Sequence, residues 1–138
     1  MSDKVDYWLE LCDEDLITAK ILLQSKRLLH MGFYCHMIVE KALKAVVASK
    51  TSAIPPKIHD LEKLAVRGGI AEELSEKQRN LMDDLSPLHI ETRYPEYKAK
   101  MAATLTFQKC KRLLAETEEF LCWIKELLGR LPKDTQAK

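Results

Sequence analysis

Several features that mark common protein classes are missing from this chain of 138 residues. Its glycines form no phosphate-cradling loop, because Gly68-Gly69 has neither a preceding strand pattern nor a P-loop lysine. Its 4 cysteines have no Cys-x-x-Cys spacing, which favours buried, reduced thiols over a disulfide framework. No apolar run approaches the ~20 residues of a membrane span, and no signal peptide is visible. We therefore expect a cytoplasmic protein without membrane association.

The net charge of +1 conceals an uneven distribution of acids and bases. Residues 1–19 hold six acidic residues against one lysine, whereas residues 41–57 and 97–115 hold several bases and no acid. If the two basic segments lie together, they form a positive surface that attracts phosphates. If they lie apart, they are ordinary solvated lysine faces, and the sequence leaves both interpretations open.

Apolar residues recur every three to four positions through most of the chain, which predicts helices and no strand. The most apolar stretch, residues 31–49, is expected to be the central helix, covered on several sides by the others. Further helices are predicted over residues 3–25, 59–67 and 99–128, and from a capping box at Ser75–Gln78 to Pro87. We expect a turn at residues 28–30 and loops at 51–57 and 86–97.

These elements predict an all-α protein, an up-and-down antiparallel four-helix bundle with one additional short helix. Residues 1–132 are expected to form a single domain, with residues 133–138 as a flexible polar tail.

One polar group of residues lies on the predicted central helix. His36, Glu40 and Lys44 are spaced four residues apart, with Lys41 beside them. The simpler interpretation is a surface ion pair between Glu40 and Lys44, worth a few tenths of a kcal/mol. The alternative is the wall of a groove that contacts a phosphate or a partner.

A second polar group lies in the predicted loop that follows Pro87. Arg93 offers a bidentate fork for a phosphate, and Tyr94 and Tyr97 can stack on a base. Alternatively, Arg93 binds the carbonyl groups of a helix end while the tyrosines cover the core.

The four histidines, His30, His36, His59 and His89, raise the question of a metal site. No two of them have the i, i+3 or i, i+4 spacing that places two ligands on one helix face. We therefore predict separate histidines, no metal and no cofactor. Cys35 and His36 are adjacent, so their side chains diverge by about 100° on a helix, which argues against a nucleophile–base pair.

Four short strings resemble the HEPN family in order and spacing. They are Gly32-x-Tyr34, Glu40-Lys41-Ala42-Leu43-Lys44-Ala45, His59-Asp60-Leu61 and Arg93-Tyr94-Pro95. The resemblance covers about residues 5–128 and implies a small helical bundle, usually a homodimer. Such proteins often act with a minimal nucleotidyltransferase as a toxin–antitoxin pair. Many members resemble metal-independent ribonucleases whose site is an Arg followed four to six residues later by His, and others bind nucleotides or proteins.

The chain departs from that nuclease motif, because no histidine follows Arg93. We therefore predict a non-catalytic module that binds a nucleotide, RNA or a partner protein. The alternative is a ribonuclease that combines Arg93 with a non-standard base, such as His89 or His36.

For the binding site we predict that Lys41, Lys44, Arg93 and Lys98 converge on one anion, with Tyr94 and His36 nearby. We also predict a homodimer, because some apolar residues lie outside the main seams of the terminal helices: Ile17, Ile21, Leu105 and Trp123.

Overall fold

The computed structural model describes residues 2–51, 57–89, 99–100 and 103–130, with only the backbone described at residues 2 and 3. Within these ranges the chain forms five complete α-helices and two short 3-10 helices, is also helical at residues 99, 100, 103 and 104, and has no strand, which confirms the all-α prediction. The elements are α1 (Ser2–Gln24), α2 (Leu28–Lys50), α3 (Leu61–Arg67), η1 (Ala71–Glu73), α4 (Glu76–Leu85), η2 (Ser86–Leu88) and α6 (Phe107–Leu127).

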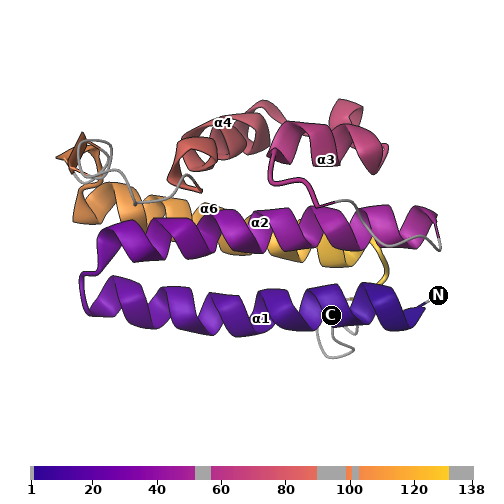
Figure 1. Ribbon diagram of the computed structural model, residues 1–138, viewed down its shortest axis with the longest axis horizontal. Helices are drawn as coiled ribbons and strands as arrows, with labels where there is room; N and C mark the ends of the chain where they lie inside the picture. The colour runs from indigo at the N-terminus through magenta and orange to yellow at the C-terminus, as the bar shows by residue number, and fades with distance from the viewer. Residues whose placement is uncertain (1, 52–56, 90–98, 101–102, 131–138) are drawn as a thin grey trace.

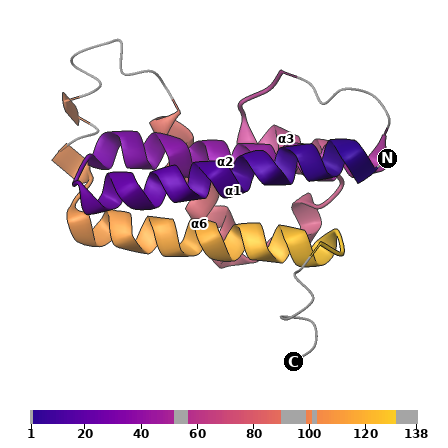
Figure 2. The same ribbon diagram turned by 90° about the horizontal axis from the view of Figure 1, so that it is seen from below.

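The three longest helices lie side by side in the lower part of the structure as Figure 1 shows it. α1 and α2 form an antiparallel hairpin, and α6 lies beside them and runs in the same direction as α2 (Figure 2). α2 contacts α1, α3, α4 and α6, and 14 of its 23 residues are buried. The prediction that this stretch is the central helix is therefore confirmed.

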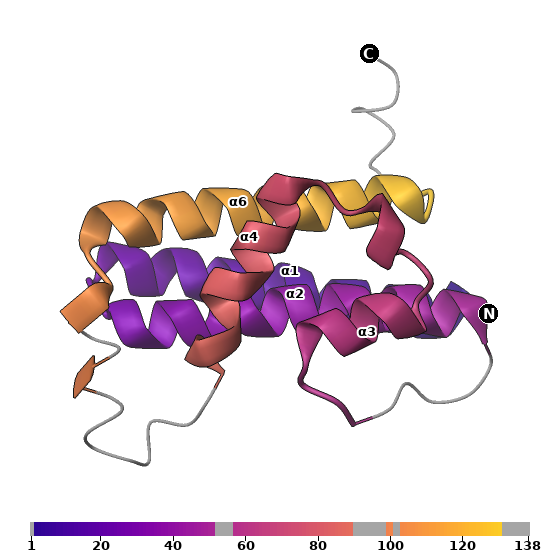
Figure 3. The ribbon, with the colours of Figure 1, turned by 90° about the horizontal axis from the view of Figure 1, so that it is seen from above.

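The shorter helices cover the side of α2 that faces away from α1. α3 lies along the C-terminal half of α2, and α4 crosses α2 and α6 at an angle (Figure 3). Local signals in the sequence place both helix starts. The Asp60 carboxylate accepts a hydrogen bond from the Lys63 N–H, and Ser75 and Gln78 form the predicted capping box.

Gly32 allows η2 to pack closely against α2. A Cβ atom added to Gly32 would lie 2.8 Å from Cδ1 of Leu88, which is buried. A side chain at this position would therefore displace the Leu88 side chain, which belongs to the last residue of η2 and directly precedes His89. The predicted interruption of the helix at Pro87 is confirmed, because α4 gives way to the tighter turn η2 there.

Two predicted boundaries were wrong. The turn between the first two helices lies at residues 25–27 and not at 28–30, because Lys26 adopts a left-handed conformation (φ 61°) and the Arg27 N–H bonds back to the Leu22 carbonyl. The predicted last helix is interrupted: residues 99, 100, 103 and 104 are helical, but Leu105 and Thr106 are not, and α6 begins at Phe107. The Thr106 side chain accepts a hydrogen bond from the Lys109 N–H and starts a new helix there.

The acidic first helix binds basic residues of the neighbouring helices. Asp15 pairs with Lys41 of α2 at 2.7 Å, and Asp13 pairs with Lys125 of α6 at 2.7 Å. The uneven charge along the sequence is therefore partly compensated by contacts between helices. Among the described helices, none combines the length and apolar character that a membrane span requires.

The apolar residues on which the dimer prediction rested divide into two groups. Ile17 and Ile21 of α1 are exposed, as expected. Leu105 is buried and Trp123 is partly buried, and both pack against the core of the same chain. Of these four residues, only Ile17 and Ile21 are therefore available for contact with a second copy of the chain.

Candidate functional site

The carboxylate of Glu40 is the centre of a polar cluster on α2. Glu40 is 1% exposed, and its Oε2 atom accepts a hydrogen bond from Nζ of Lys44 at 3.0 Å. The predicted Glu40–Lys44 ion pair is therefore present. It lies in the protein interior and not on the helix surface, since Lys44 is itself only 8% exposed. A buried carboxylate requires such partners, because it has lost its water.

Three histidines from different parts of the chain surround Glu40. Nδ1 of His59 lies 3.0 Å from Oε2 and 3.2 Å from Oε1 of Glu40, and Nδ1 of His36 lies 3.6 Å from Oε1. The rings of His59 and His89 are stacked with centroids 4.3 Å apart, and the rings of His36 and His89 are 4.8 Å apart. The prediction of separate histidines was wrong for these three; His30 alone lies apart, exposed near the start of α2.

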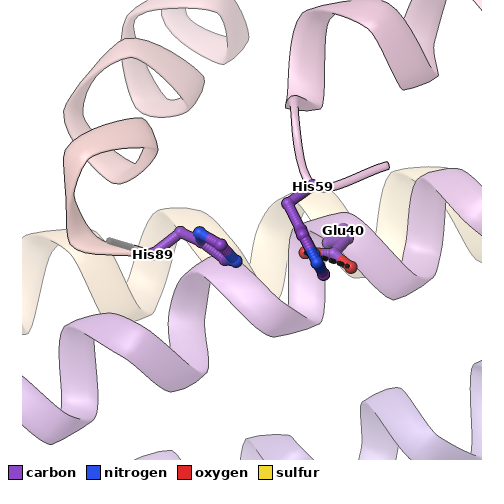
Figure 4. Close-up of side chains that lie close together, drawn as sticks. All are labelled: Glu40, His59 and His89. Atoms are coloured by element: carbon purple, nitrogen blue, oxygen red, sulfur yellow. Dashed lines mark hydrogen bonds and ion pairs between the residues drawn. The ribbon is translucent and has the colours of Figure 1, made fainter. Parts of the chain in front are cut away.

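Figure 4 shows how the fold brings this cluster together. Glu40 comes from the middle of α2, His59 from the segment just before α3, and His89 from the position just after η2. Asp60 fixes the start of α3 and so fixes the preceding residue, His59. The close contact of Gly32 with Leu88 in turn holds His89 against α2.

His36 is the most deeply buried of the three histidines, at 1% exposed. Burial lowers the pKa of His36 to about 4, and the neighbouring His89 and His59 add to the lowering, while Glu40 opposes it. His36 is therefore neutral at physiological pH. Its Nδ1 atom has no hydrogen-bond partner in the described part of the chain.

A cleft of about 650 Å³ opens beside the cluster, between α3, α4 and the polar side of α2. Its size is within the range of small-molecule sites. His36, His59 and His89 form part of its lining, and Arg79 is the only arginine or lysine among the described lining residues. The remaining charged lining residues are acidic: Asp60, Glu62, Glu72 and Asp83.

The two lysines of the predicted anion site that the structure describes, Lys41 and Lys44, are each paired with an acidic residue. Nζ of Lys41 is directed to Asp15 on α1, and Nζ of Lys44 to the buried Glu40, so both lysines bind acids of the same chain. His36 does line the cleft. Arg93, Tyr94 and Lys98 lie outside the described residues, as does the predicted tail at 133–138, so the convergence of these side chains on one anion stays a prediction.

Sequence reasoning missed His59 as a lining residue of the cleft and Phe33 as a contact of His89. The Phe33 ring is stacked with the His89 ring, with centroids 6.4 Å apart. The sequence contained two signals for His59: it belongs to the string His59-Asp60-Leu61 that resembles the HEPN family, and it directly precedes Asp60, whose spacing to Lys63 is that of a helix cap. Cys35 is next to His36 in the sequence, but its thiol stays protonated at neutral pH, because burial raises its pKa to about 12.

The helical bundle and its histidine-lined cleft define an all-α protein with a polar site on its central helix. The model of the HEPN domain family matches residues 5–127 of this chain. The chain therefore belongs to the HEPN family, as the resemblance of its short motifs predicted. No curated protein and no solved structure shows a significant match to it.

Proposed function

We propose that this HEPN protein is a non-catalytic module that binds a nucleotide in the cleft beside Glu40 and acts with a minimal nucleotidyltransferase in a toxin–antitoxin-like pair. The observation that carries the nucleotide part is the stacked pair of His59 and His89 rings, which line the cleft, with the Phe33 ring stacked on His89. The His59 side chain is 54% exposed, so it offers a flat surface on which a base can stack.

The charges of the cleft favour the base and the sugar over the phosphate as the parts that enter it. The acids that line it repel a phosphate, but their oxygens accept hydrogen bonds from amino groups and hydroxyl groups. Arg79 donates to the carbonyl of Ala71 and is therefore already engaged. We expect the phosphates of a bound nucleotide to project out of the cleft.

The absence of a family nuclease motif supports a binding role. No arginine in the whole sequence is followed four to six residues later by a histidine. Arg27 precedes His30 by three residues, and Arg79 precedes His89 by ten. Loss of a positioned general acid or base costs about 10²–10⁴ in rate.

Calorimetric titration with nucleosides and nucleotides tests the binding role. We expect His59→Ala to weaken binding by about 1–3 kcal/mol, the usual value of one base-stacking contact. His30→Ala is the matched control, because His30 is exposed and lies outside the cluster. If no nucleoside or nucleotide binds, or if His59→Ala binds as well as the parent, the proposal fails.

The partner part of the proposal is tested separately. A reading frame for a minimal nucleotidyltransferase beside this one, whose product copurifies with this chain, would support it. If a neighbouring nucleotidyltransferase is present and does not bind this chain, the pairing is refuted.

One observation favours a second candidate, a ribonuclease with a non-standard base. His59 is held by the Glu40 carboxylate beside His89 in an open cleft, and oriented imidazoles are common general acids and bases. Single-turnover assays on mixed-sequence RNA without metal decide between the candidates. Cleavage that disappears in both Arg93→Ala and His89→Ala would favour the nuclease, whereas cleavage that survives both would indicate a contaminant.

A further inference from the structure

The geometry points to a binding site for a divalent transition-metal ion, with Glu40, His59 and His89 as its ligands. One ligand atom from each of these residues lies within 4.8 Å of the other two. The three side chains converge from α2, from the segment before α3 and from the end of η2 (Figure 4). The metal site shares His59 and His89 with the proposed nucleotide site, but it does not require that a nucleotide binds.

The distances suit a metal that replaces the hydrogen bond between His59 and Glu40. Two ligands on one zinc ion, each bound at about 2.0–2.2 Å, lie roughly 3.4 Å apart in a tetrahedral site. Nδ1 of His59 is already 3.0 and 3.2 Å from the two Glu40 oxygens. His89 has to approach by about 1.5 Å at most and to turn out of its stacked position on His59.

The ligand types select the class of metal. Two imidazoles and one carboxylate suit Zn²⁺, Fe²⁺, Co²⁺ or Ni²⁺, whereas Mg²⁺ and Ca²⁺ prefer sites made of oxygen atoms. Both histidines line the 650 Å³ cleft, so a coordination position facing the cleft remains open to water or a ligand.

The residues around Glu40 provide the outer shell that such a site needs. Lys44 holds Oε2 of Glu40 at 3.0 Å, which fixes the carboxylate, while Nδ1 of His59 lies within 3.2 Å of both oxygens and Nδ1 of His36 lies 3.6 Å from Oε1. A metal on Oε1 therefore binds the oxygen that Lys44 does not hold. The nearby ammonium group still repels the metal, so we expect weaker binding than at a closed structural zinc site.

The test uses the full chain without an affinity tag, treated with a chelator, dialysed and kept free of nucleotide. Calorimetric titration with Zn²⁺ should show one site per chain, with weaker binding of Co²⁺ and no detectable binding of Mg²⁺. His59→Ala and His89→Ala should each weaken Zn²⁺ binding by at least about tenfold, since even the loss of an outer-shell partner typically has an effect of that size. Both replaced histidines lie at the cleft, and circular dichroism checks that each variant keeps its helices.

Two control variants exclude other zinc ligands on the surface. His30→Ala removes the exposed histidine outside the cluster, and Cys122→Ser removes the exposed cysteine. Both should bind Zn²⁺ as the parent does. The inference is overturned if the parent does not bind Zn²⁺, if both cluster variants bind it as well as the parent, or if Cys122→Ser alone abolishes binding. Failure of metal binding leaves nucleotide binding untouched, because the titration contains no nucleotide.

Discussion

Protonation of His36 should make this protein sensitive to acid. His36 is 1% exposed, and burial lowers its pKa from the ordinary value of 6.5 to about 4. The unfolded chain therefore binds a proton at a higher pH than the folded protein does. The contribution of His36 to the unfolding free energy is therefore constant above about pH 6.5. It decreases progressively as the pH falls toward about 4, because the unfolded chain takes up the proton first.

The size of this effect follows from the pKa difference. A difference of about 2.5 pKa units corresponds to about 3 kcal/mol in total, of which about 2 kcal/mol is lost between about pH 7 and about pH 5. Glu40, His59 and His89 are the titratable groups that face His36. Urea denaturation of the parent across these pH values measures the total decline in unfolding free energy.

The variant His36→Gln isolates the contribution of His36. Glutamine does not titrate, and its side chain is polar and can donate a hydrogen bond. We expect its unfolding free energy to decline by about 2 kcal/mol less than that of the parent between about pH 7 and about pH 5. His30→Gln should follow the parent, because His30 is exposed. Equal declines in the parent and in His36→Gln would refute the assignment of this acid sensitivity to His36.

Three further predictions concern packing and assembly. Lys44→Met should lower the unfolding free energy by about 3–5 kcal/mol in urea denaturation, because it leaves the buried Glu40 carboxylate without its cation. Gly32→Ala should lower it by about 1–3 kcal/mol, because the new methyl group would lie 2.8 Å from Cδ1 of Leu88. Light scattering should give a homodimer of about 32 kDa, twice the 15.9 kDa of one chain, and Ile17→Glu should convert it to a monomer.

Two of these predictions have a matched control on the surface. Lys77→Met breaks an exposed ion pair with Glu119 and should cost about 0–1 kcal/mol, so an equal cost at Lys44 would contradict the buried-pair argument. Val66→Glu changes an exposed apolar residue on α3 and should leave the dimer intact. A mass of about 16 kDa for the parent would rule out the dimer.

The sequence by itself determined the local elements of this protein. Helix periodicity, the capping box at Ser75–Gln78 and the interruption at Pro87 each depend on residues within a few positions of one another. Such signals predicted the all-α class, the central helix and the ion pair between Glu40 and Lys44, and the short motifs indicated the HEPN family. Boundaries that depend on a single turn conformation, as at Lys26, were not predictable in this way.

Only the tertiary structure decided where the candidate site lies. Glu40, His59 and His89 are far apart in the sequence, and no local spacing relates them. They meet because α3 and η2 pack on the same side of α2, at a distance that Gly32 permits. The same packing buries Glu40 and His36 and turns a predicted surface ion pair into an interior one. Burial and the contacts between distant segments depend on how all the helices pack together, which local sequence patterns do not specify.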